Sequence, residues 1–120
     1  MPQRILLIED DPRLAGMVME YLRGAGFIVD HAERGEAGLA RIGQSAYDAL
    51  VLDLTLPDGG GLSLLQALRQ KALPPETPVI VVSSRLVTRS ELRSHKVTEF
   101  LPKPFDVRRL LSRVEALAGA

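Results

Sequence analysis

The sequence has no cysteine, no excess of either charge and no long hydrophobic run. Without cysteine there is no disulfide scaffold, no thiolate zinc site and no cysteine nucleophile. Fifteen basic and fifteen acidic residues cancel, so net charge gives no reason to expect binding to nucleic acid or to a membrane surface. No apolar run approaches the roughly 20 residues of a membrane span, and the N-terminus has no signal-peptide pattern. We therefore expect a cytoplasmic protein.

The chain has 120 residues, of which 46% are hydrophobic, enough for one core but not for two. We predict a single domain over residues 1–120. Short apolar runs alternate with segments of helical periodicity, which predicts an α/β fold with a doubly wound parallel sheet. The predicted strands cover residues 4–8, 27–29, 49–53, 79–82 and 100–101. The predicted helices cover residues 12–25, 36–42, 61–71 and 107–118, and the polar segment 85–96 predicts a short helix. In the helix at 36–42, Ala37, Ala40 and Ile42 are expected to face the core.

Three carboxylates follow predicted strands. Glu9 and Asp10 come directly after the first strand, and Asp53 ends the third, before a glycine-rich turn at 57–61. The carboxyl ends of parallel strands share one edge of the sheet, where ligands bind, so these side chains are expected in one crevice. Two carboxylates about 4 Å apart repel by roughly 4 kcal/mol at an effective dielectric near 20. A divalent cation would remove that cost, and oxygen ligands without Cys or His favour Mg²⁺.

Two further polar residues follow the remaining strands of this edge. Ser83 comes after the strand at 79–82, and Lys103 after the strand at 100–101. Carboxylates form aspartyl phosphates, and phosphoryl transfer depends mostly on positioning and charge neutralisation. Lys103 and the cation could hold phosphoryl oxygens during transfer to Asp53, and Ser83 could donate a hydrogen bond to the new phosphoryl group.

Neighbouring polar residues have simpler interpretations. Asp11 stands before Pro12 and is predicted to be the N-cap of the first helix. His31 and His95 are too isolated for a metal pair, and both are predicted to be surface residues.

Together these residues resemble the receiver domain of two-component response regulators. The matching segments are Glu9-Asp10, Asp53 in Leu-Asp-Leu-Thr-Leu-Pro-Asp, Ser83 after Val-Ile-Val-Val, and Lys103-Pro104-Phe105. The resemblance covers essentially the whole chain. The first and last helices are most similar to those of receivers attached to winged-helix DNA-binding domains. The resemblance implies a flavodoxin-like (βα)5 fold with strand order 2-1-3-4-5.

The resemblance also implies roles for individual residues at the acidic edge. Asp53 would accept a phosphoryl group from a sensor histidine kinase or a phosphotransfer protein. Glu9, Asp10, Asp53 and the backbone carbonyl of Thr55 would bind Mg²⁺. The domain would not be an enzyme, although it could assist its own phosphorylation and dephosphorylation.

The remaining implied roles concern signal output. Lys103 would contact the phosphoryl group and precede a cis peptide bond, and Ser83 and Phe100 would form a switch pair. The surface made by segments 85–96, 100–101 and 107–118 would contact a downstream effector or the protein's own output domain. The same surface could form a homodimer, with Arg113 matching a basic residue of the dimer face.

Two other functions fit parts of the pattern. A degenerate receiver would act by protein contacts alone, independently of phosphorylation. A small aspartyl-phosphate phosphohydrolase would also need a strand-end Asp, a hydroxyl and a Lys, as in haloacid-dehalogenase-like enzymes. Those enzymes usually begin with Asp-x-Asp, whereas here the central motif is Asp53-Leu54-Thr55 and the acidic pair precedes it.

Overall fold

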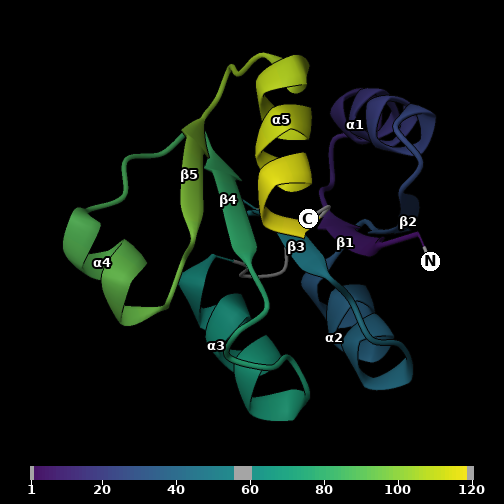
Figure 1. Ribbon diagram of the computed structural model, residues 1–120. Helices are drawn as coiled ribbons and strands as arrows, with labels where there is room; N and C mark the ends of the chain where they lie inside the picture. The colour runs from purple at the N-terminus through teal and green to yellow at the C-terminus, as the bar shows by residue number, and fades with distance from the viewer. Residues whose placement is uncertain (1, 56–60, 119–120) are drawn as a thin grey trace.

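The protein is described by a computed structural model that covers residues 2–55 and 61–118. Within these residues five strands alternate with five helices (Figure 1). The strands are β1 (Arg4–Ile8), β2 (Ile28–Ala32), β3 (Ala49–Asp53), β4 (Val79–Ser83) and β5 (Glu99–Pro102). The helices are α1 (Pro12–Gly24), α2 (Gly35–Gln44), α3 (Leu62–Lys71), α4 (Arg89–Ser94) and α5 (Val107–Ala118). No helix among the described residues is long and apolar enough to cross a membrane.

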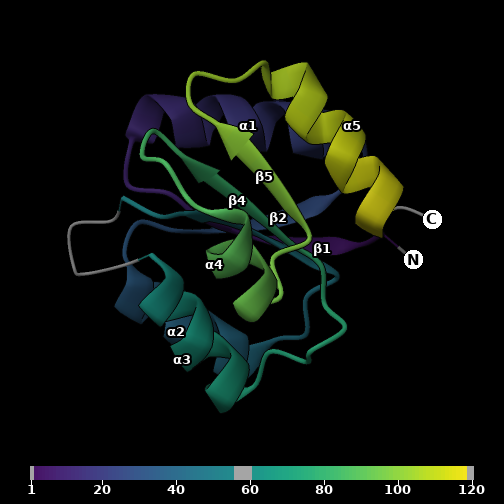
Figure 2. The same cartoon turned by 90° about the vertical axis from the view of Figure 1, so that its left-hand side faces the viewer.

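The five strands form one parallel sheet in the order β2-β1-β3-β4-β5, as predicted. Figures 1 and 2 show α1 and α5 on one face of the sheet and α2 and α3 on the other. The short helix α4 lies near the β5 edge, on the side of α3. Because β1 and β3 are neighbours at the centre, the residues at their carboxyl ends come together.

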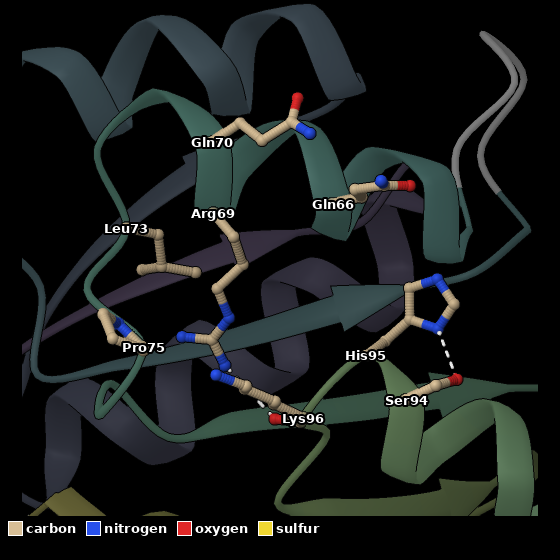
Figure 3. A pocket seen from close by; sticks show the side chains of 8 residues that line it. All are labelled: Gln66, Arg69, Gln70, Leu73, Pro75, Ser94, His95 and Lys96. Carbon is tan, nitrogen blue, oxygen red and sulfur yellow. Dashed lines mark hydrogen bonds between the residues drawn. The ribbon is translucent and has the colours of Figure 1, made fainter.

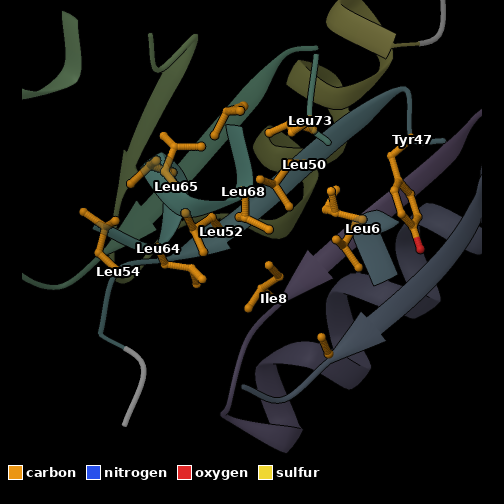
Figure 4. Packing of buried hydrophobic residues seen from close by; sticks show 14 of the residues in the cluster. Leu6, Ile8, Tyr47, Leu50, Leu52, Leu54, Leu64, Leu65, Leu68 and Leu73 are labelled. Atoms are coloured by element: carbon orange, nitrogen blue, oxygen red, sulfur yellow. The ribbon is translucent and has the colours of Figure 1, made fainter. Parts of the chain in front are cut away.

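Alternate residues of the central strands fill two separate cores. Leu6, Ile8, Leu50 and Leu52 pack under α2 and α3 (Figure 4), while Ile5, Leu7 and Val51 pack under α1 and α5. Side chains alternate between the faces of a sheet, so a strand covered on both sides is apolar at every position. This explains why all five residues of β3 are buried, including Asp53.

Helix α2 packs through glycine rather than through the alanines that we expected to face the core. Ala37 and Ala40 are exposed, whereas Gly35, Gly38 and Ile42 are buried. A Cβ atom on Gly38 would overlap the Cδ1 atom of Ile8, so any larger residue would force the Ile8 side chain or the helix to shift. The prediction of the buried face was wrong because it treated glycines as helix boundaries and alanines as core residues.

Helix α4 is short, as predicted, and buries none of its residues. Its ends are closed by local hydrogen bonds. Thr88 and Glu91 form a capping box at the start. At the end, Lys96 takes a φ of 56°, and the N–H of Val97 donates to the Leu92 carbonyl. This is a Schellman turn in which Lys96 occupies the left-handed position that glycine usually takes.

Two turn predictions have different outcomes. Asp11 is the N-cap of α1, since its side chain accepts from the N–H groups of Arg13 and Leu14. Of the turn predicted at 57–61, residues 57–60 lie outside the described part of the chain, and Gly61 is the N-cap of α3.

Candidate functional site

The structure brings together the three carboxylates predicted from the sequence. Glu9, Asp10 and Asp53 each offer one oxygen, and these oxygens all lie within 4.8 Å of one another. Glu9 is 1% exposed and Asp53 is fully buried, whereas Asp10 is exposed to solvent. Three carboxylates without thiolate or imidazole ligands suit a hard divalent cation such as Mg²⁺. The donor set therefore fits a metal that reaches the cluster from the Asp10 side.

Lys103, which directly follows β5 at the same edge of the sheet, completes the cluster. Its Nζ atom lies 3.1 Å from Asp53 Oδ2 and 3.1 Å from Glu9 Oε1. The backbone N–H of Lys103 donates to the Ser83 carbonyl at 2.8 Å, which ties the ends of β5 and β4 together. The Lys103–Pro104 peptide bond is cis, as the resemblance implied. One half-buried ammonium group thus contacts two buried carboxylates.

Thr55 holds Asp53 in a way that the sequence interpretation missed. Its N–H and its hydroxyl donate to Asp53 Oδ1 at 3.0 and 2.8 Å. A carboxylate that accepts from residue i+2 is the ordinary Asx-turn pattern, so the Asp-x-Thr spacing was an available signal. Oδ1 of Asp53 is therefore fixed by Thr55, and Oδ2 by Lys103. The Thr55 carbonyl as a metal ligand stays a prediction.

Glu9 is held by neighbours that include a histidine predicted to be at the surface. His31 is half-buried, and its Nε2 donates to the Glu9 carbonyl at 2.7 Å. The Glu9 N–H donates to the Ala32 carbonyl at 3.0 Å, and the Asp11 N–H donates to Glu9 Oε2 at 3.2 Å. His31 was predicted to be a surface residue; it is half-buried on the edge strand β2, where its ring reaches the Glu9 carbonyl.

Burial and hydrogen bonding shift the pKa values of Glu9 and Asp53 in opposite directions. Burial, together with the hydrogen bond to Asp53, raises the pKa of Glu9 to about 7. Burial also acts to raise the pKa of Asp53, but hydrogen bonds from Glu9, Thr55 and Lys103 outweigh it and lower that pKa. Burial opposes the charge of Lys103, yet the two carboxylates raise its pKa. Asp53 is thus an ionised carboxylate beside a cation, as a nucleophile toward phosphorus needs to be.

Ser83 and Phe100 lie on neighbouring strands beside this cluster. Ser83 is 1% exposed, and its hydroxyl oxygen accepts from the Arg85 N–H at 3.0 Å. Phe100 is half-buried and packs against the core under α2 and α3. β4 and β5 pair in parallel, with Val81 opposite Phe100. The two proposed switch residues therefore sit on adjacent strands, two residues apart along the β4 register.

A family model described as the response regulator receiver domain matches residues 5–115. The chain belongs to this family. A receiver domain is a signalling domain of two-component response regulators, and this family's model covers residues 5–115 of the chain.

Curated relatives are longer than this chain. Over 116 residues it is 36% identical to the transcriptional activator protein PfeR of Pseudomonas aeruginosa, covering 95% of this chain and 37% of PfeR. Over 116 residues it is 37% identical to the transcriptional regulatory protein QseB of Haemophilus influenzae, covering 95% of this chain and 52% of QseB. The chain therefore spans between about a third and a half of these relatives, whose names agree with the expected kinship to receivers of transcription factors.

Solved receiver structures share the fold. The Francisella response regulator 1452 receiver domain is 28% identical, with a TM-score of 0.86 and coverage of 98% of this chain and 97% of that one. The receiver domain of sensor histidine kinase PA1611 from Pseudomonas aeruginosa is 24% identical, with a TM-score of 0.86 and full coverage of both chains. That structure holds a magnesium ion in its active site cleft.

Proposed function

We propose that this receiver domain is a phosphoacceptor switch, in which Asp53 accepts a phosphoryl group from a sensor histidine kinase or a phosphotransfer protein. The observation that carries the proposal is the partly buried contact of 3.1 Å between Lys103 Nζ and Asp53 Oδ2, beside a carboxylate cluster suited to a cation. A degenerate receiver would have no need of this arrangement. The Asp53–Lys103 contact therefore favours the phosphoacceptor over a module that acts by protein contacts alone.

The reaction forms one bond and breaks one. A carboxylate oxygen of Asp53 attacks phosphorus, and the bond between phosphorus and the donor's imidazole nitrogen breaks, leaving the electron pair on that nitrogen. Lys103 is placed to pair with the phosphoryl oxygens, and the Thr55 contacts hold the carboxylate of Asp53 in one orientation. Glu9, Asp10, Asp53 and the Thr55 carbonyl would hold Mg²⁺. When bound, this ion neutralises charge on the carboxylates and on the transferred group.

The proposed switch uses Ser83 and Phe100. After phosphorylation the Ser83 hydroxyl would turn from the Arg85 N–H to a phosphoryl oxygen, and the Phe100 ring would turn inward. To move a population from 1:99 to 99:1, phosphorylation must favour the active state by about 5.5 kcal/mol. A phosphoryl group adds nearly two negative charges and three acceptor oxygens for Lys103, Ser83 and the cation to bind.

The output surface would be the one formed by α4, β5 and α5. Its partner would be a downstream effector or an output domain of the same protein, since PfeR and QseB are longer transcriptional regulators. Homodimerisation through this surface would have to accommodate Arg113, whose guanidinium lies 3.0 Å from Glu99 Oε1 within the same chain. We propose that the domain works in the cytoplasm and does not itself bind nucleic acid.

Intact mass after incubation with acetyl phosphate and Mg²⁺ tests the proposal. Wild-type protein is expected to gain one phosphoryl group, and Asp53→Asn is expected to gain none. Asp48→Asn, which changes an exposed carboxylate on the opposite end of the sheet, is the matched control and should gain the group. If wild type gains no group while a known receiver in the same buffer does, the domain is degenerate. Rapid hydrolysis of unrelated phosphomonoesters would identify a phosphohydrolase instead.

A further inference from the structure

A cavity lies between α3 and the turn that follows α4, at the end of the sheet opposite the acidic cluster. Its volume is about 420 Å³, within the range of roughly 300–1,000 Å³ that is typical of small-molecule sites. The lining comes from α3, the loop that follows it and the end of α4, as Figure 3 shows. The lining residues are Gln66, Arg69, Gln70, Leu73, Pro75, Ser94, His95 and Lys96.

The lining of this cavity combines basic and apolar side chains. It contains two strongly basic side chains, Arg69 and Lys96, and no acidic residue. Leu73, which is 3% exposed, and Pro75 supply an apolar wall. Cationic groups beside an apolar wall suit a ligand that carries a negative charge next to a hydrocarbon part.

The Arg69 guanidinium has N–H donors that are not all paired within the protein. Its Nη1 donates to the carbonyls of Pro74 and Thr77, at 2.5 and 3.3 Å, and its Nη2 donates to the Lys96 carbonyl at 3.2 Å. A guanidinium has five N–H donors, so three are used by neutral oxygens. The buried Nε has no hydrogen-bond partner, and Arg69 forms no ion pair with any carboxylate in the described part of the chain.

The direct hydrogen-bond partners of the Arg69 guanidinium are therefore all neutral carbonyl oxygens. Burial lowers the pKa of Arg69, while the charge of Glu76 acts in the opposite direction from a distance. Charge-assisted hydrogen bonds to a carboxylate are roughly twice as strong as those to neutral oxygens. A carboxylate in the cavity would therefore gain more from Arg69 and Lys96 than a neutral ligand of the same shape.

We propose that this cavity binds a small organic monocarboxylate, with its carboxylate toward Arg69 and Lys96 and its apolar part against Leu73 and Pro75. The ligand would touch both α3 and the turn at Lys96, which the Arg69–Lys96 hydrogen bond already connects. Binding would thus hold α4 against α3 without contacting the acidic cluster. This inference does not depend on phosphorylation of Asp53.

Titration of ¹⁵N-labelled protein with benzoate tests the inference by NMR. Benzoate should shift the amide signals of Ser94, His95 and Lys96 in a saturable way. Benzamide, which lacks the charge, and acetate, which lacks the apolar part, should each bind several-fold more weakly. No saturable shift at these residues, or equal binding of benzamide, would overturn the proposal.

Two variants separate this site from general charge attraction. Lys96→Asn removes a lining cation, and Asn tolerates the left-handed backbone at this position, so the fold should be kept. Its affinity for benzoate should fall about three- to fivefold. Arg93→Gln removes the same charge from the exposed surface of α4, outside the lining, and should bind like wild type. Equal weakening by both variants would mean that benzoate responds only to overall charge.

Discussion

Lys103 Nζ lies 3.1 Å from Asp53 Oδ2, although 50 residues separate the two in the sequence. The contact is possible because β5 and β3 both flank β4 and end at the same edge of the sheet. The same ammonium group also contacts Glu9, so removing Lys103 would leave two buried carboxylates without a cation. The position of this one lysine therefore determines the charge balance of the whole site.

Replacing Lys103 by alanine is expected to slow phosphorylation by acetyl phosphate by about 100-fold, the usual effect of removing one group that stabilises a charged transition state. The rate is measured by quenching samples for intact mass at successive times. Lys71→Ala, at an exposed position at the end of α3, should react like wild type. Wild-type rates in the Lys103 variant would rule out its contact with the phosphoryl group.

Replacing Asp10 by asparagine is expected to remove the stabilisation by Mg²⁺ without weakening the metal-free fold. Asp10 is exposed, and the change relieves repulsion within the carboxylate cluster. In wild type, Mg²⁺ at ten times its Kd should add about 1.4 kcal/mol to the free energy of unfolding. Urea denaturation with and without Mg²⁺ measures this difference. Glu20→Gln, elsewhere on the exposed surface, should keep the full response, and a retained response in Asp10→Asn would exclude Asp10 as a ligand.

Two glycine substitutions should change stability in opposite directions. Gly38→Ala forces a methyl group against Ile8 and should cost about 1–3 kcal/mol of unfolding free energy. Gly16→Ala, in the middle of α1 with nothing within 4 Å of the new Cβ, should stabilise by about 0.5–1 kcal/mol. Chemical denaturation of both variants measures the difference. Equal effects would mean that α2 does not pack on β1 as closely as described.

Asp30 should make part of the stability dependent on pH. Burial acts to raise its pKa, but hydrogen bonds from Tyr47 and Arg4, at 2.7 and 3.1 Å, outweigh it and lower that pKa in the folded state. A carboxyl with a lowered folded pKa stabilises above its unfolded value near 3.9, and this contribution is lost as pH falls through the folded pKa. Asp30→Asn should therefore cost about 1–2 kcal/mol at pH 7 and progressively less in acid.

Denaturation of wild type and Asp30→Asn from pH 7 down to the acid transition measures how the difference in unfolding free energy between them decreases. In Tyr47→Phe, which removes the hydroxyl but keeps the carboxyl, NMR should find Asp30 titrating at higher pH than in wild type. If the difference in unfolding free energy between wild type and Asp30→Asn stays constant with pH, the Asp30 carboxyl contributes through its shape and not through its charge.

Ser83→Ala separates phosphorylation from switching. The Ser83 hydroxyl is uncharged and bonded to the Arg85 N–H, so its loss should still allow Asp53 to acquire the phosphoryl group at a measurable rate. NMR signals of Phe100 and of α4 should then change much less on phosphorylation than they do in wild type. If the phosphorylation yield and the spectral change fall by the same factor, Ser83 has no separate role in the switch.

The sequence predicted the parts of this fold that depend on hydrophobic pattern. Continuous apolar runs identified β1, β3 and β4, and the strand ends located Glu9, Asp10, Asp53 and Lys103. These predictions succeeded because a strand buried on both faces tolerates few polar residues, and the ones at its end are therefore conspicuous.

The contacts that failed prediction depend on what lies beside a residue in space. The buried face of α2 is set by the approach of Gly38 to Ile8, which no periodicity within the helix reveals. His31 looked isolated because its partner, the carbonyl of Glu9, belongs to a different strand. The hydrogen bond from the Thr55 hydroxyl to Asp53, in contrast, could have been predicted from the two-residue spacing between them.

The construction of α4 affects how a signal could cross this domain. Its first turn is closed by Thr88 and Glu91, its last by the backbone around Lys96, and none of its residues is buried. Its apolar contacts are limited to the half-buried Leu92 and to the flanking Val87 and Val97, so the hydrophobic effect resists a rigid reorientation only weakly. Further resistance comes from a few polar links such as the hydrogen bond from Arg69 to the Lys96 carbonyl. Small changes in binding energy should therefore be enough to redistribute its orientations, while the two cores on opposite faces of the sheet stay intact.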